Sequence, residues 1–130
     1  MTKEMLMGIG TCGIIMAAAV IAVARYMMAH KDDRNIERIF VDELNMGEVK
    51  KWFMDKITSD SLKGCIFYPT KENSEKWKIK TPEQKNMLVQ AVYNEDKDEI
   101  VAYREITFSE MSPKLKELLE ANKGTVVIER

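Results

Sequence analysis

The sequence predicts an α+β domain that follows a single N-terminal transmembrane helix. Three observations lead to this fold class. A charge-free apolar run opens the chain, segments with helical periodicity follow it, and two β-rich segments further on are separated by a short polar stretch. We expect residues 1–30 to form the tail and the anchor. Residues 31–130 would form one soluble domain of two helices, a mixed or antiparallel sheet with a hairpin, and a short C-terminal helix and strand.

The apolar run Met5–Ala24 has the length and composition of a membrane helix. At ~1.5 Å per residue it reaches ~30 Å, the thickness of the hydrocarbon core of a bilayer. The residues expected to anchor it in the membrane are Met5, Ile14, Ile15, Val20, Ile21 and Val23. A cleaved signal peptide is the alternative, because Ala22-Val23-Ala24 has the small-x-small form of a cleavage site.

More basic residues follow the run than precede it. Lys3 lies before it, and those close behind it are Arg25, Lys31, Arg34 and Arg38. This asymmetry predicts a single-pass protein in the cell membrane with its C-terminal domain in the cytoplasm. The residues expected at the membrane interface are Arg25, Tyr26 and Lys31.

Small residues recur four positions apart within the run. The pairs are Gly8 with Cys12, Gly13 with Ala17, and Ala18 with Ala22. Such spacing lets a second helix approach closely, so a homodimer through this helix face is one hypothesis. The alternative is the ordinary abundance of Gly and Ala in membrane helices, because a strict G-x-x-x-G motif is absent from the sequence.

Two apolar stripes with helical spacing open the soluble part. The first consists of Ile36, Ile39, Phe40 and Leu44, and the second of Val49, Trp52, Phe53 and Ile57. We expect two helices separated at Asn45-Met46-Gly47, with Asn45 as the cap of the second helix. They would pack as a layer on the sheet, and an amphipathic pair lying on the membrane surface is the alternative.

The β-rich segments come next. Cys65–Tyr68 is a short strand ended by Pro69, and Trp77 with Ile79 forms a candidate edge strand. The clearest block, residues 86–107, predicts a β-hairpin around a polar turn. A helix that begins at Thr81-Pro82 is the alternative for its first arm.

The end of the chain predicts one helix and one strand. Ser112-Pro113 would begin the helix, Asn122-Lys123-Gly124 would end it, and residues 125–128 would form the strand.

Few residues suggest chemistry. The 20 basic and 21 acidic residues nearly cancel, so nucleic acid is not an expected partner. The single histidine, His30, and two cysteines give no metal-ligand or Cys–His pattern. Carboxylates and an amide match four positions of a calcium loop at Asn94, Asp96, Asp98 and Glu105, but Glu99 stands where that loop requires glycine. We therefore expect no metal and no cofactor.

The sequence thus favours a membrane-anchored cytoplasmic module whose partners are the lipid bilayer and a protein that the sequence does not identify. An exported binding domain, released by cleavage or facing outward, is the second hypothesis. A small enzyme that uses Cys65 as a nucleophile is the third.

Overall fold

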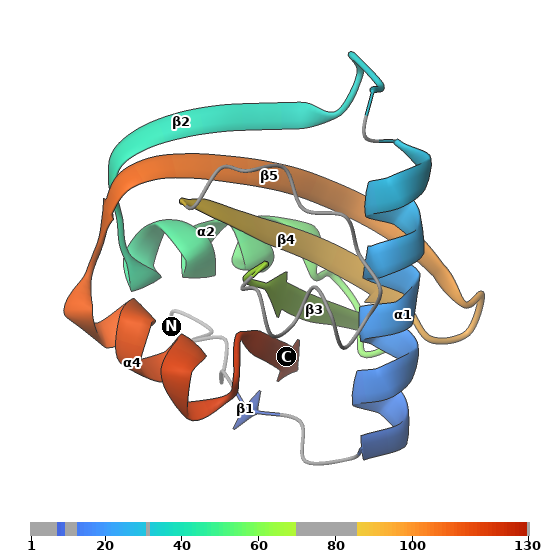
Figure 1. The fold of residues 1–130 in the computed structure, drawn as a ribbon. Coiled ribbons are helices and arrows are strands. Elements are labelled where there is room, and N and C mark those ends of the chain that lie inside the picture. The colour runs from blue at the N-terminus through green and yellow to red at the C-terminus, as the bar shows by residue number, and fades with distance from the viewer. Residues whose placement is uncertain (1–7, 10–12, 31, 70–85, 130) are drawn as a thin grey trace.

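The fold is an α+β domain with three helices and a mixed sheet (Figure 1). In this computed structural model, the structure describes residues 8–9, 13–30, 32–69 and 86–129. The helices are α1 (Gly13–Ala29), α2 (Met46–Lys56) and α4 (Pro113–Ala121). The strands are β2 (Glu37–Leu44), β3 (Leu62–Phe67), β4 (Met87–Asn94), β5 (Glu99–Met111) and β6 (Thr125–Glu129), with the two-residue β1 (Gly8–Ile9) at one edge.

The sheet has the order β1-β6-β3-β4-β5-β2. All neighbours are antiparallel except β2 and β5, which run parallel with Glu37 opposite Arg104 and Leu44 opposite Met111. Of the two predicted alternatives, a mixed or an antiparallel sheet, the structure therefore shows the mixed one. Because parallel neighbours need a crossover connection, the chain passes through α2, β3 and β4 between β2 and β5.

The hairpin is confirmed as β4 and β5, which settles residues 87–94 as strand rather than helix. Its turn follows from local chemistry, since the Asn94 side-chain oxygen accepts hydrogen bonds from the backbone N–H groups of Asp96 and Lys97. Asp98 adopts a left-handed conformation, φ 49°, which aspartate tolerates better than most residues. The start of the alternative helix at Thr81-Pro82 lies outside the described residues. So does the candidate edge strand with Trp77 and Ile79.

The helix predicted over Ile36–Leu44 is wrong, because Glu37–Leu44 form the strand β2. Ile39 and Val41 pack against the core, whereas Phe40 between them is exposed. That alternation is the two-residue period of a strand. The apolar spacing also fits a helix, but pairing with β5 satisfies the backbone of these residues and decides the outcome.

The second predicted helix and the C-terminal helix are confirmed as α2 and α4. Asn45 caps α2, as expected, and its side chain accepts a hydrogen bond from the backbone N–H of Glu48 at 2.9 Å. Pro113 is the first residue of α4. After α4 the chain reverses at Gly124, whose φ of 83° suits glycine and whose N–H donates to the carbonyl of Leu119 at 2.7 Å.

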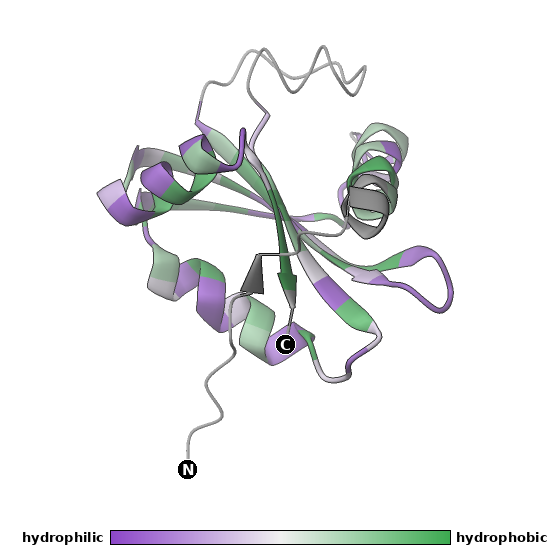
Figure 2. Cartoon of the chain, turned by 90° about the horizontal axis from the view of Figure 1, so that it is seen from below, coloured by the Kyte–Doolittle hydropathy of each residue, from purple (hydrophilic) through white to green (hydrophobic). Residues whose placement is uncertain are grey.

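The three helices cover opposite faces of the sheet (Figure 2). Helices α2 and α4 pack on one face and bury Trp52, Phe53, Leu115 and Leu119 there. Helix α1 packs on the other face. The core of the domain therefore has two layers separated by the sheet.

Residues 13–24 of the predicted anchor lie in α1. Val20, Val23 and Ala24 are buried, together with Met27 beyond the run, in a cluster with sheet residues. Of the other predicted anchor and packing residues, Met5 and Cys12 lie outside the described residues, Gly8 lies in β1, and Gly13, Ile14, Ile15 and Ala17 are described only as helical backbone. Within the described chain, no helix combines the length and the hydropathy needed to cross a membrane.

Candidate functional site

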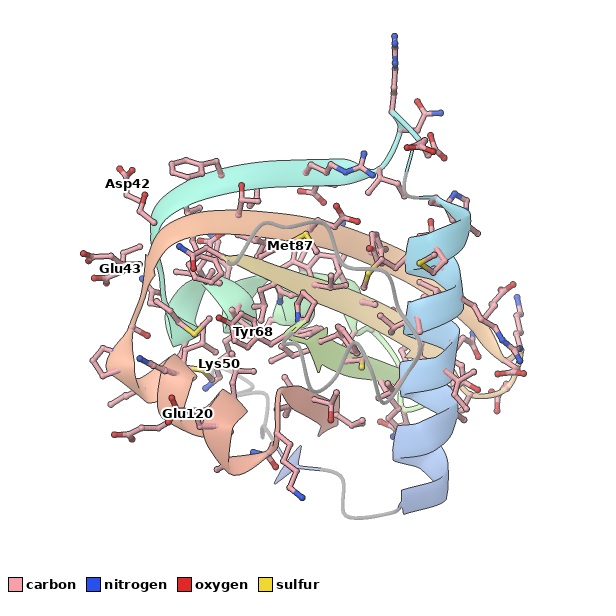
Figure 3. The ribbon with its side chains drawn as sticks, in the orientation of Figure 1. Asp42, Glu43, Lys50, Tyr68, Met87 and Glu120 are labelled. Carbon is pink, nitrogen blue, oxygen red and sulfur yellow. The ribbon has the colours of Figure 1, made fainter. Side chains whose placement is uncertain are left out.

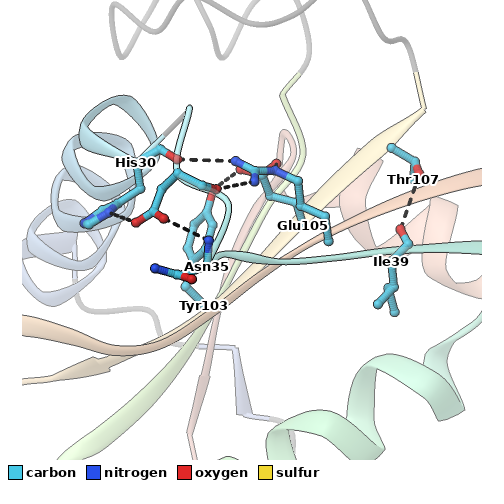
Figure 4. Close-up of polar contacts among 8 residues, drawn as sticks. His30, Asn35, Ile39, Tyr103, Glu105 and Thr107 are labelled. Atoms are coloured by element: carbon cyan, nitrogen blue, oxygen red, sulfur yellow. Dashed lines mark hydrogen bonds and ion pairs between the residues drawn. The ribbon is translucent and has the colours of Figure 1, made fainter.

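A polar cluster joins the C-terminal end of α1 to β2 and β5 (Figure 4). Arg38 lies at its centre. The Arg38 Nε donates to the carboxylate of Glu105 at 3.0 Å, and its two terminal nitrogens donate to the backbone carbonyls of Asp33 at 2.6 Å and His30 at 3.3 Å. A cation that binds the carbonyl at the end of a helix stabilises that end. Arg38 therefore ties the end of α1 to the sheet.

Aromatic rings complete this junction. The Tyr26 ring lies 4.2 Å from the His30 ring and 4.8 Å from the Tyr103 ring, measured between centroids. The Tyr103 hydroxyl donates to Glu105 at 2.7 Å, and burial, followed by this hydrogen bond, raises the pKa of Tyr103. Tyr26, one of the three residues expected at a membrane interface, packs on the Tyr103 ring of the domain. Of the other two, Arg25 is exposed and Lys31 lies outside the described residues.

Asp33 holds the loop that leaves α1. Its carboxylate accepts a hydrogen bond from the backbone N–H of Asn35 at 2.8 Å and lies 3.1 Å from the His30 Nδ1. These two contacts, the backbone one first, lower the pKa of Asp33. The described residues of this junction are paired with one another, an arrangement that positions α1 and offers no reactive group.

A second polar cluster, which no local sequence pattern predicts, is buried between α2 and the sheet. Arg104 is only 4% exposed, its Nε donates to the Gln90 side-chain oxygen at 2.8 Å, and its guanidinium carbon lies 5.1 Å from the centroid of the Trp52 ring. Gln90 in turn donates to the backbone carbonyl of Val49 at 3.0 Å. Burial lowers the pKa of Arg104, although Glu48, 3.7 Å away, favours its charge. These bonds satisfy groups that would otherwise be costly to bury.

Cys65 lies on β3, buried among apolar side chains of the α1 face. Removal from water raises the pKa of its thiol to about 12. Because the thiolate is the nucleophilic form, a thiol protonated at neutral pH is poorly suited to catalysis. His30 is engaged at the α1 junction instead.

The calcium-loop match does not assemble in space. Asn94, Asp96 and Asp98 lie in the hairpin turn, where Asp98 accepts a hydrogen bond from the Tyr93 hydroxyl. Glu105 lies along β5 and binds Arg38 and Tyr103. Among the described residues, no three His, Cys, Asp or Glu side chains are grouped as metal ligands.

A cleft of about 910 Å³ lies between α4 and the adjoining ends of β2 and β5. Apolar side chains and charges of both signs line it, among them Tyr68, Phe108, Leu119, Glu43 and Lys116. This mixture does not favour one class of ligand. Comparison of the chain with protein-family models, with curated proteins and with solved structures found no match.

Proposed function

We propose that the chain is a membrane-tethered interaction module, in which residues 5–24 hold a small cytoplasmic α+β domain at the bilayer and the domain binds another protein. The observation that carries this proposal is the surface of α1. A helix that covers a sheet in water usually has one apolar and one polar side. The exposed sides of α2 and α4 follow this rule, with Lys51, Asp55, Lys114 and Glu117 among their exposed residues.

Helix α1 lacks such a polar side before Arg25. Its residues from Gly13 to Ala24 carry no charge, and Ile21 is 39% exposed on the side turned away from the sheet. Figure 2 shows the contrast, with α1 largely in the colours of apolar residues and the other helices alternating. A helix that is apolar all round suits lipid or the interior of a protein rather than water. This supports a bilayer as the environment of the apolar run.

The proposal of a protein partner rests on residues of α1 that would contact either the lipid bilayer or the sheet. Val20, Val23 and Ala24 belong to the apolar run and also contact the sheet. When they enter a bilayer, the sheet face beneath them loses its cover. The residues of that face are Cys65, Phe67, Met87, Val89, Ala91 and Tyr103. An apolar face of this kind is stable only against another apolar surface, which a partner protein would supply.

The tether is tested by washing membranes from cells that express the full chain with alkaline carbonate. The wild type should stay in the membrane pellet. Replacing both Ile14 and Ile15 with lysine should move the protein to the supernatant, because each lysine at the centre of a span costs about 2.5–3.5 kcal/mol. The matched control, Met54→Lys with Val101→Lys, adds the same charge at exposed positions and should leave the distribution unchanged. Wild-type protein released by carbonate would contradict the tether.

Four further measurements separate the remaining alternatives. Proteolysis of intact cells should spare the domain if it is cytoplasmic. A mature chain that begins at Arg25 would replace the proposal with the exported domain. Reproducible purification from solubilised membranes without any bound protein would count against the interaction role, and equal self-association of wild type and Gly13→Leu would remove the homodimer through the apolar helix.

A further inference from the structure

Strand β2 forms one edge of the sheet, and β5 is the only described strand that pairs with it. An edge strand presents backbone N–H and C=O groups that another strand can bind, so edges are usually short or charged. β2 is eight residues long, and its four charged residues flank an uncharged central stretch, Ile39-Phe40-Val41. Its centre is occupied by Phe40, which is 62% exposed. A long edge with an exposed aromatic residue at its centre is a surface suited to pairing with another strand.

The charges around Phe40 indicate which strand fits. Because side chains alternate along a strand, Arg38 and Asp42 lie on the same face of β2 as Phe40, one on each side of it. The three residues are therefore positive, aromatic and negative in order along that face, and the Arg38 guanidinium keeps its bond to Glu105 within the chain while its charge acts across the edge. Figure 3 shows the side chains of Asp42 and Glu43 projecting outward at the far end of β2.

We propose that two copies of this chain pair antiparallel along β2, with Phe40 on the two-fold axis. This register sets Phe40 opposite Phe40 of the second copy and Arg38 opposite its Asp42, and symmetry repeats the charge pair. On the other face, Ile39 lies opposite Val41. Aromatic pairs and opposite charges directly across two strands are stabilising.

Neighbouring registers are less favourable. The next ones that keep the two sheet faces aligned are shifted by two residues, and they set Phe40 opposite either Arg38 or Asp42. The Phe40-centred register also sets Glu37 opposite Glu43 of the second copy, an unfavourable pair that symmetry repeats, because like charges across strands repel. That pair provides a sharp test of the register.

The experiment measures the dimer Kd of the solubilised full chain by sedimentation equilibrium. Asp42→Lys and Glu43→Lys make the same change of charge at adjacent, exposed residues on opposite faces of β2. Asp42→Lys turns an attractive pair into a repulsive one and should weaken the dimer about tenfold. Glu43→Lys does the reverse and should strengthen it about tenfold, since each pair occurs twice and each contributes roughly 0.2–1 kcal/mol.

Three outcomes overturn the proposal. The first is a wild type that is monomeric at every concentration. The second is a shift of both lysine variants in the same direction, which would show that net charge alone governs association. The third is a dimer that ignores both variants and is lost in Gly13→Leu, which would assign the contact to the apolar helix.

Disulfide cross-linking supplies a second, independent measurement. In a Cys12→Ser background, Phe40→Cys should form a disulfide-linked dimer under mild oxidation. Opposite residues of an antiparallel pair have Cα atoms about 4.5–5.5 Å apart, which a disulfide can bridge. Val101→Cys, an exposed position on β5, is the control and should stay monomeric. Equal cross-linking of the two variants would contradict the Phe40-centred register.

Discussion

On one face of the sheet, α2 and α4 bury large aromatic and branched side chains and turn their charges outward. On the other face, α1 contacts the sheet through smaller residues such as Val20, Val23 and Ala24, and its outer side is apolar too. The first face is complete within the domain. The second depends on a helix that is equally suited to another apolar environment. Stability should therefore respond differently to substitutions on the two faces.

The largest effect is expected on the complete face, at Phe53. Its side chain is fully buried, and a Cβ added at Gly64 beneath it would lie 2.8 Å from the Phe53 ring. Phe53→Ala should lower the free energy of unfolding by about 3–5 kcal/mol. Gly64→Ala should cost about 1–3 kcal/mol alone but less in the Phe53→Ala background, where the ring is absent. Urea unfolding of the four chains measures this coupling, and additive losses would contradict it.

A smaller effect is expected on the other face, at Met27, which is buried against the sheet but lies beyond the apolar run. Met27→Ala should lower the unfolding free energy by about 2 kcal/mol where α1 rests on the sheet. Ile21→Ala, on the outer side of the same helix, is the control and should change it by less than about 0.5 kcal/mol. Urea unfolding in micelles and in lipid vesicles tests this. A loss at Met27 that disappears in vesicles would show that α1 leaves the sheet in a bilayer.

The pH dependence of the unfolding free energy tests whether α1 covers Cys65 on this face of the sheet. Burial raises its pKa from 9.0 to about 12, so the unfolded chain loses this proton first as pH rises. The stabilisation is fully present below pH 9 and is lost as pH rises toward 12, by about 1.4 kcal/mol per pH unit. In Cys65→Ala this part of the alkaline slope should vanish. An unchanged slope, or rapid maleimide labelling of Cys65 in a Cys12→Ser chain at neutral pH, would mean that the face is open.

The smallest effect distinguishes the two helices of the complete face. Asn45→Ala removes the side-chain hydrogen bond that caps α2 and should cost about 1 kcal/mol. Ser112 precedes α4 without such a bond, and its buried hydroxyl has no hydrogen-bond partner among the described residues. Ser112→Ala should therefore leave stability unchanged or slightly increased. Thermal unfolding compares them, and equal losses would show that Asn45 contributes no cap.

The parts of the fold that the sequence predicted correctly are those fixed by local chemistry. The hairpin followed from two β-rich arms around a polar turn, and α2 and α4 followed from apolar spacing with Asn45 and Pro113 at their starts. The helix predicted over Ile36–Leu44 failed because the same apolar positions fit two periods, and the strand that decides between them comes much later in the chain.

The buried polar cluster was missed for a similar reason. Arg104 lies in a β-rich run and is stabilised by Gln90, 14 residues away, and by proximity to Trp52 on α2. Nothing beside Arg104 in the sequence marks it as buried. Likewise, Arg38 was interpreted as one of several cations near the membrane, whereas its partner Glu105 lies 67 residues further along. Contacts between distant segments carry no local pattern.

The parallel pairing of β2 with β5 has a consequence for synthesis. The partner of each β2 residue lies 67 positions later, as Arg38 and Glu105 illustrate. At about 5–20 residues per second, a ribosome adds that partner roughly 3–13 seconds after the β2 residue itself. During this interval neither edge of β2 is paired with β5, because β5 has not yet been synthesised. Phe40 is then exposed in the nascent chain. Neighbouring ribosomes on one messenger RNA would then hold incomplete copies of the chain close together. Their β2 segments, which we propose pair in the folded dimer, could meet before folding is complete.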